Sequence, residues 1–166
     1  GFLGRHVVRA LANDGWRIRV AVRKPNLAHF LKPMGRVGQI QIVKANIGND
    51  EQVRAALKGA EATVNLVGIL APGGGQTFDS AHVQGPARIA RIAAEEGAAP
   101  RGWLSPWISE STATPDLLKE AGYAYNLNWC HDDQPVPMHT RSGATLWSIP
   151  YPQELNDIPM IVARQM

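Results

Sequence analysis

Cysteine is almost absent from this sequence of 166 residues, which contains only Cys130. A single thiol excludes a disulfide framework or a cysteine-rich zinc site within the chain, and it fits a reducing, cytoplasmic compartment. We expect Cys130 to be buried and inert, because the sequence offers no activating base for it. No apolar run approaches the roughly 18 residues of a membrane-spanning helix, and no secretory signal is present. Because the chain starts at Gly1 rather than Met, we expect it to begin inside a longer reading frame or after a processed segment.

Charge is unevenly distributed along the chain. Residues 1–100 contain 13 Lys+Arg and 7 Asp+Glu, whereas residues 101–166 contain 4 and 7. Four of the five tryptophans lie in the second part, so the composition predicts two segments of different origin. The basic residues of the first part are scattered rather than clustered, which argues against nucleic-acid binding. With 45% apolar residues, the chain has enough hydrophobic material to bury a core.

Hydrophobic periodicity in the first hundred residues predicts alternating helices and strands. The predicted elements are a helix at 1–13, a strand at 17–22, a short helix at 27–34, a strand at 39–43, a helix at 50–57 capped by Asn49 and Asp50, a strand at 62–67 and a helix at 81–96. This alternation is typical of an α/β fold with a doubly wound parallel sheet. The strand that should precede the first helix is missing from the sequence. It would lie between 17–22 and 62–67, so we expect unpaired strand edges and an aggregation-prone chain unless another strand fills the gap.

Glycines at the first helix and a basic pair after the first predicted strand indicate a dinucleotide site. Gly1 and Gly4 have the spacing of the last two glycines in a phosphate-binding turn, where a helix N-terminus faces the pyrophosphate. The alternative is an ordinary helix start, but the alternating elements that follow and the basic end of the next strand favour the phosphate-binding turn. Arg23 and Lys24 follow the predicted strand, where NAD sites usually carry an acidic residue, so they favour NADP with its 2′-phosphate. The alternative for this pair is a solvated charged turn.

The stretch GFLGRHVVRAL, with IRVAVRKP and VKANIGNDEQVRAALKGAEATVNLVGIL, resembles the atypical short-chain dehydrogenase/reductase family. The resemblance covers residues 1–98 and is strongest to epimerase/dehydratase-like proteins and the NAD(P)H-binding subunit of respiratory complex I. It implies an NADP or NAD cofactor and a possible association with complex I. The cofactor contacts that it implies are Gly1, Phe2, Leu3 and Gly4 at the pyrophosphate, Arg23 and Lys24 at the 2′-phosphate, Asn46 and Ile47 at the adenine, and Leu66, Val67 and Gly68 beside the ribose.

Hydride transfer in this family needs a Tyr-x-x-x-Lys pair, and this sequence has none. Neither Tyr123, Tyr125 nor Tyr151 has a lysine four residues later. Because the tyrosine of such a pair is the general acid/base, we expect no hydride-transfer catalyst in this chain. His82 invites a catalytic interpretation, but a surface or packing histidine on a helix flank is the simpler one.

The second part of the chain has a different pattern. A short helix is predicted to start at Thr114, strands at 123–129 and 146–149, and irregular proline-rich chain elsewhere. The stretches RGWLSPWISESTATPDLLKEAGYAY, NWCHDDQPV and SIPYPQELNDIP resemble the allantoinase-like branch of the polysaccharide deacetylase family, which hydrolyses C–N bonds in a distorted barrel. The resemblance implies catalytic or pocket roles for Arg101, Trp103, Asp132 and Asp133, with Asn128 at a position where Asp is expected.

A metal site is not expected in this second part. Deacetylases hold their metal with one Asp and two His, which lie upstream in the family and are absent here. His131 stands beside Asp132 and Asp133, but adjacent residues on a strand point to opposite faces, so a solvated loop is the simpler interpretation.

The sequence as a whole predicts two partial domains. Residues 1–98 form an NAD(P)-binding Rossmann-like domain that lacks its first strand, and residues 99–166 form a partial deacetylase-like barrel segment with little regular structure. The leading function is NAD(P) binding without complete catalytic machinery. The alternatives are an amidohydrolase fragment and a chimeric fragment without activity.

Overall fold

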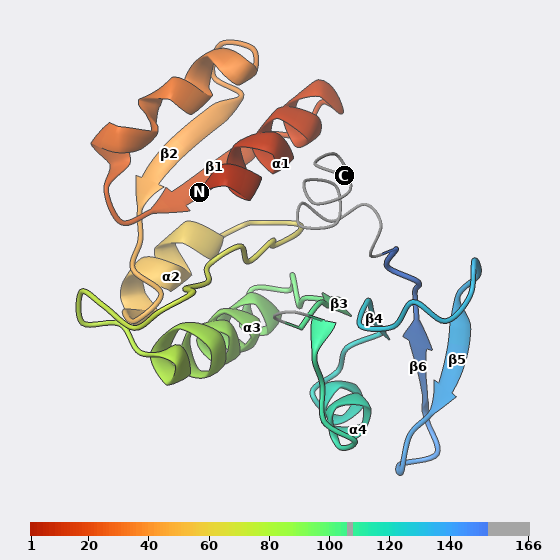
Figure 1. Ribbon diagram of the computed structural model, residues 1–166. Helices are drawn as coiled ribbons and strands as arrows, with labels where there is room; N and C mark the ends of the chain where they lie inside the picture. The colour runs from red at the N-terminus through yellow and green to blue at the C-terminus, as the bar shows by residue number, and fades with distance from the viewer. Residues whose placement is uncertain (106–107, 153–166) are drawn as a thin grey trace, which may run out of the picture. The chain divides into compact units, whose positions relative to one another are not determined.

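The computed structural model describes residues 1–105 and 108–152. By its contacts the chain divides into two compact units, Gly1–Ala99 and Pro100–Met166. The elements of unit 1 are α1 (Phe2–Asn13), β1 (Ile18–Val22), the 3₁₀ helix η1 (Pro25–Met34), β2 (Ile40–Lys44), α2 (Asp50–Leu57), the π-helical turn η2 (Ser80–Gln84) and α3 (Gly85–Glu95) (Figure 1). The predicted α/β order is thus confirmed for most of this unit.

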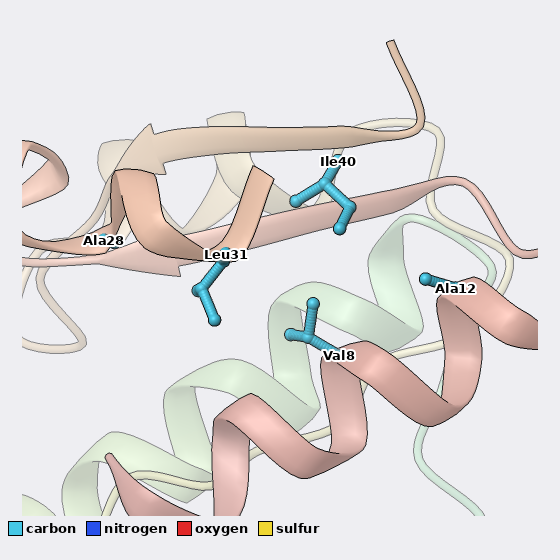
Figure 2. Packing of buried hydrophobic residues seen from close by; sticks show 5 residues of the cluster. All are labelled: Val8, Ala12, Ala28, Leu31 and Ile40. Atoms are coloured by element: carbon cyan, nitrogen blue, oxygen red, sulfur yellow. The ribbon is translucent and has the colours of Figure 1, made fainter. Parts of the chain in front are cut away.

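β1 and β2 form a two-stranded parallel sheet, in register from Ile18 opposite Ile40 to Val22 opposite Lys44. Side chains alternate along β1, so that Ile18, Val20 and Val22 are partly buried while the residues between them are exposed. The apolar side packs on helices, in a core made of Val8, Ala12, Ala28, Leu31 and Ile40 (Figure 2). Amphipathic periodicity alone therefore accounts for the way α1 and η1 cover this sheet.

A second core joins α2 to α3. Val53 and Leu57 pack against Ile92 and Ala93, and Ile92 is completely buried. Asn49 caps α2, because its side-chain oxygen accepts a hydrogen bond of 2.9 Å from Gln52 N, as the sequence predicts.

Ion pairs link the exposed sides of the same two helices. Arg88 and Arg91 both bind Asp50, and Arg54 and Arg91 both bind Glu95. The hydrogen bond from Arg88 is the main cause that holds the pKa of Asp50 below its ordinary value, and that from Arg54 does the same for the pKa of Glu95.

The strand predicted at 62–67 is wrong: this segment runs as coil and pairs with no strand among the described residues. Its apolar side chains are largely exposed, with 60% of Val64 and 45% of Leu66 accessible to solvent. A strand exists only through hydrogen bonds to a neighbour, and the expected neighbour precedes α1 in the doubly wound order. Among the described residues no strand pairs with this segment, so it has no ladder to join.

Unit 2 contains β3 (Gly102–Trp103), α4 (Thr114–Glu120), β4 (Tyr125–Asn126), β5 (Val136–His139) and β6 (Thr145–Ser148). They form a four-stranded sheet in the order β3-β4-β6-β5, with β3, β4 and β6 parallel and β5 antiparallel. Leu118, Tyr123 and Leu146 make its core. The described residues of this unit therefore show an open mixed sheet, and the predicted barrel is not shown.

Regular structure after residue 98 is limited, in the described part of the chain, to α4 and four short strands, but neither β3 nor β5 was predicted. The proline-rich stretch contains β5, which forms an antiparallel hairpin with β6. The turn of this hairpin contains Gly143 at a φ of +77°. Pro137 is compatible with β5 because this strand lies at the edge of the sheet, where a missing N–H need not pair. The strand predicted at 123–129 is shorter than expected, since only Tyr125 and Asn126 pair as β4.

Candidate dinucleotide site

The site predicted in unit 1 lies at the carboxyl ends of β1 and β2. Ala45 N donates to Val22 O at 2.9 Å, which keeps the two strand ends together. Arg23 and Asn46 follow directly, so the sheet places the predicted 2′-phosphate and adenine residues at one edge. In open α/β sheets ligands bind outside the carboxyl ends of the strands.

Gly1 is the N-cap of α1 and makes no side-chain cap hydrogen bond. A Cβ at Gly1 would meet nothing within 4 Å, so the backbone there is open to an incoming group. Phe2 and Leu3 are 64% and 60% exposed. A Cβ at Gly4 would lie 3.9 Å from Leu66 Cδ1, so the predicted pyrophosphate and ribose segments are neighbours.

Arg23 and Lys24 are both exposed. The Arg23 guanidinium donates from Nη1 to Gln76 Oε1 at 3.1 Å, a contact that the sequence did not indicate. Within residues 1–105 and 108–152 neither cation makes an ion pair with a carboxylate. The end of β1 thus carries two positive charges that no carboxylate neutralises in the described part of the chain.

Hydrogen bonds with residues of α2 and α3 hold the loop after β2. Asn46 N donates to Gln52 Oε1 at 3.0 Å, and Asn46 Oδ1 accepts from Gly48 N at 3.0 Å. Arg88 Nη1 donates to Ile47 O at 2.8 Å. A Cβ at Gly85 would lie 2.5 Å from Ile47 Cδ1, so this glycine lets α3 approach the loop closely.

Leu66, Val67 and Gly68 lie in the coil that replaces the predicted strand. Val67 N donates to Asn65 Oδ1 within the segment. Ile69, the next residue, lies within hydrogen-bond distance of His82 through both its N and its O. The interpretation of His82 as a packing histidine missed this contact, since no local pattern links residues 69 and 82.

The four residues predicted to be catalytic in unit 2 lie in two stretches of the chain, 101–103 and 132–133, and their roles stay predictions. Arg101 is exposed, and its carbonyl accepts hydrogen bonds from Ala124 N and Tyr125 N. Trp103 Nε1 donates to Ser105 Oγ at 2.9 Å. In the described residues no hydrogen bond or ion pair joins Arg101 to Asp132 or Asp133. These two residues are exposed, and Asp133 N donates to Asp132 Oδ1 at 2.7 Å.

A polar cluster that the sequence did not indicate surrounds Glu110. Its carboxylate accepts hydrogen bonds from Trp129 Nε1 at 2.6 Å and from the side-chain amide of Asn128. Asn128 Oδ1 in turn accepts from Ser105 N at 2.8 Å. Asn128 thus serves as both donor and acceptor, a role that the expected Asp could not fill.

Two further expectations for unit 2 can be compared with the structure. Cys130 is exposed rather than buried, and its Sγ contacts Tyr151 O at 2.7 Å, so that prediction is wrong. Its residue type favours burial, but its position on a loop exposes it. His131 Nε2 lies 2.8 Å from Ser148 Oγ. Among the described residues no three His, Cys, Asp or Glu side chains gather as a metal-binding group, and no helix there is long and apolar enough to cross a membrane.

The sequence of unit 1 matches a known protein family. Residues 1–101 match the family model described as NAD(P)H-binding. The chain belongs to the NAD(P)H-binding family. This match confirms the expected class of cofactor, a nicotinamide dinucleotide. The choice between NADP and NAD and the individual contact residues stay predictions.

Curated relatives of this NAD(P)H-binding chain include oxidoreductases and complex I subunits. Over 98 residues, 59% of the chain, it is 34% identical to the ceramide reductase of Caulobacter vibrioides. It is 26% identical over 57% of its length to the mitochondrial NADH-ubiquinone oxidoreductase 40 kDa subunit of Neurospora crassa. It is 27% identical over 73% of its length to the mitochondrial NADH dehydrogenase (ubiquinone) 1 alpha subcomplex subunit 9 of Arabidopsis thaliana. The matched stretches cover 30%, 25% and 30% of these relatives.

Solved structures support the fold of the NAD(P)H-binding chain. A short-chain dehydrogenase/reductase variant from Serratia marcescens aligns with 99% of this chain and 78% of its own, at a TM-score of 0.55 and 14% identity. A nucleoside-diphosphate-sugar epimerase from Staphylococcus aureus aligns with 76% of this chain and 46% of its own, at a TM-score of 0.53 and 17% identity. At these identities the two structures show a shared α/β fold, and the predicted resemblance of residues 1–98 is confirmed at the level of an NAD(P)H-binding domain. The resemblance of residues 100–166 to the deacetylase family stays a prediction.

Proposed function

We propose that unit 1 binds NADPH in preference to NADH at the carboxyl edge of its sheet, with Arg23 and Lys24 at the 2′-phosphate. The observation that carries this proposal is the exposed pair of cations directly after β1, without a carboxylate partner among the described residues. A 2′-phosphate beside two cations gains charge-assisted hydrogen bonds that NADH cannot make.

The start of α1 fits the pyrophosphate of such a cofactor. The first turn of a helix presents unpaired N–H groups and a partial positive charge, both of which favour phosphate. Gly1 leaves open space at this point, and no acidic residue lies in the first turn of α1 to repel an anion. Asn46 and Ile47 would meet the adenine, and Leu66, Val67 and Gly68 would line the ribose.

We also propose that the chain as printed binds the cofactor without transferring a hydride. The sequence lacks the Tyr-x-x-x-Lys pair that its relatives' group uses for proton transfer. What the nicotinamide ring supplies, when it is bound, is a hydride donor or acceptor. This chain's own residues would bind and orient the dinucleotide.

A calorimetric titration with NADPH and NADH tests the cofactor preference. We expect the parent chain to bind NADPH more tightly. The double variant Arg23→Ala/Lys24→Ala should lose most of that preference, because charge-assisted hydrogen bonds contribute about 1.5–3 kcal/mol each. NADH affinity should change much less, since its ribose carries no phosphate at this position.

The matched control removes two positive charges at the other end of the strands. Arg17 and Arg36 are both exposed. Arg17 lies between α1 and β1, and Arg36 lies in the turn that precedes β2. The variant Arg17→Ala/Arg36→Ala should keep the NADPH preference. Equal affinities of the parent chain for the two nucleotides would refute the NADP assignment, and absence of binding to either would refute the site.

An association with respiratory complex I is a second proposal, supported by the similarity to the two subunits named above. Both are named mitochondrial, so the cytoplasmic localisation expected from the sequence stays a prediction. Co-migration of the full chain with complex I on native gels would support this association, and a free chain at all loadings would contradict it.

For residues 99–166 we propose no hydrolytic activity. Among the described residues no hydrogen bond or ion pair joins the deacetylase-like residues Arg101 and Asp132, and the sequence lacks the expected metal ligands. An assay on allantoin and on N-acetylated sugar oligomers, with and without zinc, should show no turnover above background. Turnover that Arg101→Ala abolishes would contradict this expectation.

A further inference from the structure

His82 lies in the middle of η2, the π-helical turn that leads into α3. Its ring is partly buried, and its Nε2 lies 3.2 Å from Ile69 N and 2.9 Å from Ile69 O. A π-helical turn accommodates one extra residue in a helix and is often found at functional positions. The extra residue changes the direction of the side chains in the turn. In this turn the His82 ring reaches Ile69, 13 positions earlier in the sequence.

The segment that His82 contacts has little else to hold it. Residues 62–67 form no strand, and the hydrogen bond of Val67 N is local, to Asn65 Oδ1. Among the described residues, the contact between His82 and Ile69 is the hydrogen bond that joins the segment 62–70 to another element. A coil without ladder hydrogen bonds is expected to open at low free-energy cost unless such a contact restrains it.

The ring of His82 is itself held in place. A Cβ at Gly68 would lie 3.4 Å from His82 Cε1, so the ring lies directly beside the glycine backbone. The Phe78 ring is 6.0 Å from the His82 ring, centroid to centroid. Three residues further along the chain, Gly85 lets Ile47 pack closely on the same helix. One helical stretch thus contacts both loops that are expected to line the dinucleotide.

We propose that His82 is a positioning residue for the dinucleotide, because it fixes Ile69 and with it the adjoining Leu66–Gly68 segment. The proposal rests on the function proposed above, which places that segment beside the ribose. Nε2 either accepts from Ile69 N–H or, when it carries a hydrogen, donates to Ile69 O. Each state supplies one hydrogen bond to the same residue. Leu66 and Gly68 need to be held in one arrangement before the cofactor arrives, since ordering a loop on binding lowers affinity.

The variants His82→Ala and His82→Gln test this role, with Val83→Ala as the matched control. Val83 is the next residue of the same turn and is 60% exposed. Loss of one hydrogen bond should weaken NADPH binding of His82→Ala about tenfold. Glutamine carries both a donor and an acceptor, so His82→Gln should bind within about threefold of the parent chain. Val83→Ala should bind as the parent chain does.

Amide hydrogen exchange without cofactor provides a readout that does not depend on binding. Exchange at Val67, Gly68 and Ile69 should be faster in His82→Ala and restored in His82→Gln, while exchange in α1 and β1 stays unchanged. Faster exchange throughout unit 1, without rescue by glutamine, would show a general folding role and overturn the proposal. Equal NADPH affinities of the parent chain and His82→Ala would also overturn it.

The parent chain supplies the measurement needed if His82→Ala does not fold. The ¹⁵N signals of the His82 ring should show a hydrogen-bonded Nε2 in the parent chain, and signals of a ring whose Nε2 makes no hydrogen bond would overturn the proposal. Failure of the parent chain to bind NADPH would instead overturn the proposed function, and the positioning role with it. Parent binding with an unaffected His82→Ala variant would overturn the positioning role alone.

Discussion

The close approach of α3 to the loop after β2 makes a sharp prediction about Gly85→Ala. Gly85 is buried in a right-handed helical conformation, with φ −62° and ψ −55°, so alanine fits its backbone without strain. The new Cβ would lie 2.5 Å from Ile47 Cδ1, 3.3 Å from Ile47 Cγ1 and 3.1 Å from Ser80 O. The first distance is far below van der Waals contact, so either Ile47 or the helix must move.

Two opposing effects set the size of the change in the free energy of unfolding. Alanine is favoured over glycine in a helix by about 1 kcal/mol. Overpacking a well-packed contact costs about 1–3 kcal/mol. The contact with Ser80 involves backbone, which adjusts less readily than a side chain. We therefore expect a net loss of about 1 kcal/mol, equivalent to ~4–8 °C in the melting temperature of a unit of this size.

Urea unfolding followed through the amide signals of α2 and α3 measures this change in unit 1 alone. Ile47→Ala removes the side chain that the new Cβ meets, so the cost of Gly85→Ala should fall in the Ile47→Ala background. Such a coupling is the direct test of contact between two residues. Gly4→Ala is the matched control, because its Cβ would meet only Leu66 Cδ1 at 3.9 Å.

The control should be neutral or stabilising by up to about 1 kcal/mol, since alanine is the better helix former and the space is free. If Gly85→Ala is as stabilising as Gly4→Ala, the close packing of α3 on Ile47 is refuted. The same conclusion follows if Gly85→Ala changes stability equally with and without the Ile47 side chain.

Three further predictions concern stability. Ile92→Ala should destabilise unit 1 by about 2–5 kcal/mol in urea unfolding, because Ile92 is completely buried. The control Val83→Ala, at an exposed position, should change the free energy of unfolding by less than about 0.5 kcal/mol, and equal effects of the two variants would contradict the assigned core. The pKa of Asp50 is lowered in the folded state, so the contribution of Asp50 to the free energy of unfolding is complete above its ordinary pKa and is lost as the pH falls below about 4. Unfolding midpoints measured between pH 2 and 6 should show this decline, and a flat profile would contradict it. Glu110→Ala should destabilise unit 2 by about 1–3 kcal/mol, because it leaves the buried amide of Asn128 without its acceptor, and an unchanged melting curve would exclude this role.

The sequence by itself determined the elements whose signals are local. The 3.6-residue period predicted α1, strict alternation predicted β1, and Asn49 predicted the start of α2 through a bond to a residue three positions away. The glycines and the basic pair indicated a dinucleotide site, and the family match supports that cofactor class. These signals survive without tertiary information because each depends on residues within about one helical turn or on neighbours along one strand.

Only the tertiary structure decided the features that depend on distant partners. Residues 62–67 have the apolar composition of a buried strand, but a strand needs a neighbour to accept its hydrogen bonds, and no described strand pairs with them. Cys130 has the chemistry of a buried residue, yet its loop leaves it exposed. His82 reaches Ile69 across 13 positions of sequence, through a π-helical turn that no periodicity predicts. Such contacts are set by which surfaces fold together, and the local pattern of side chains carries no information about that.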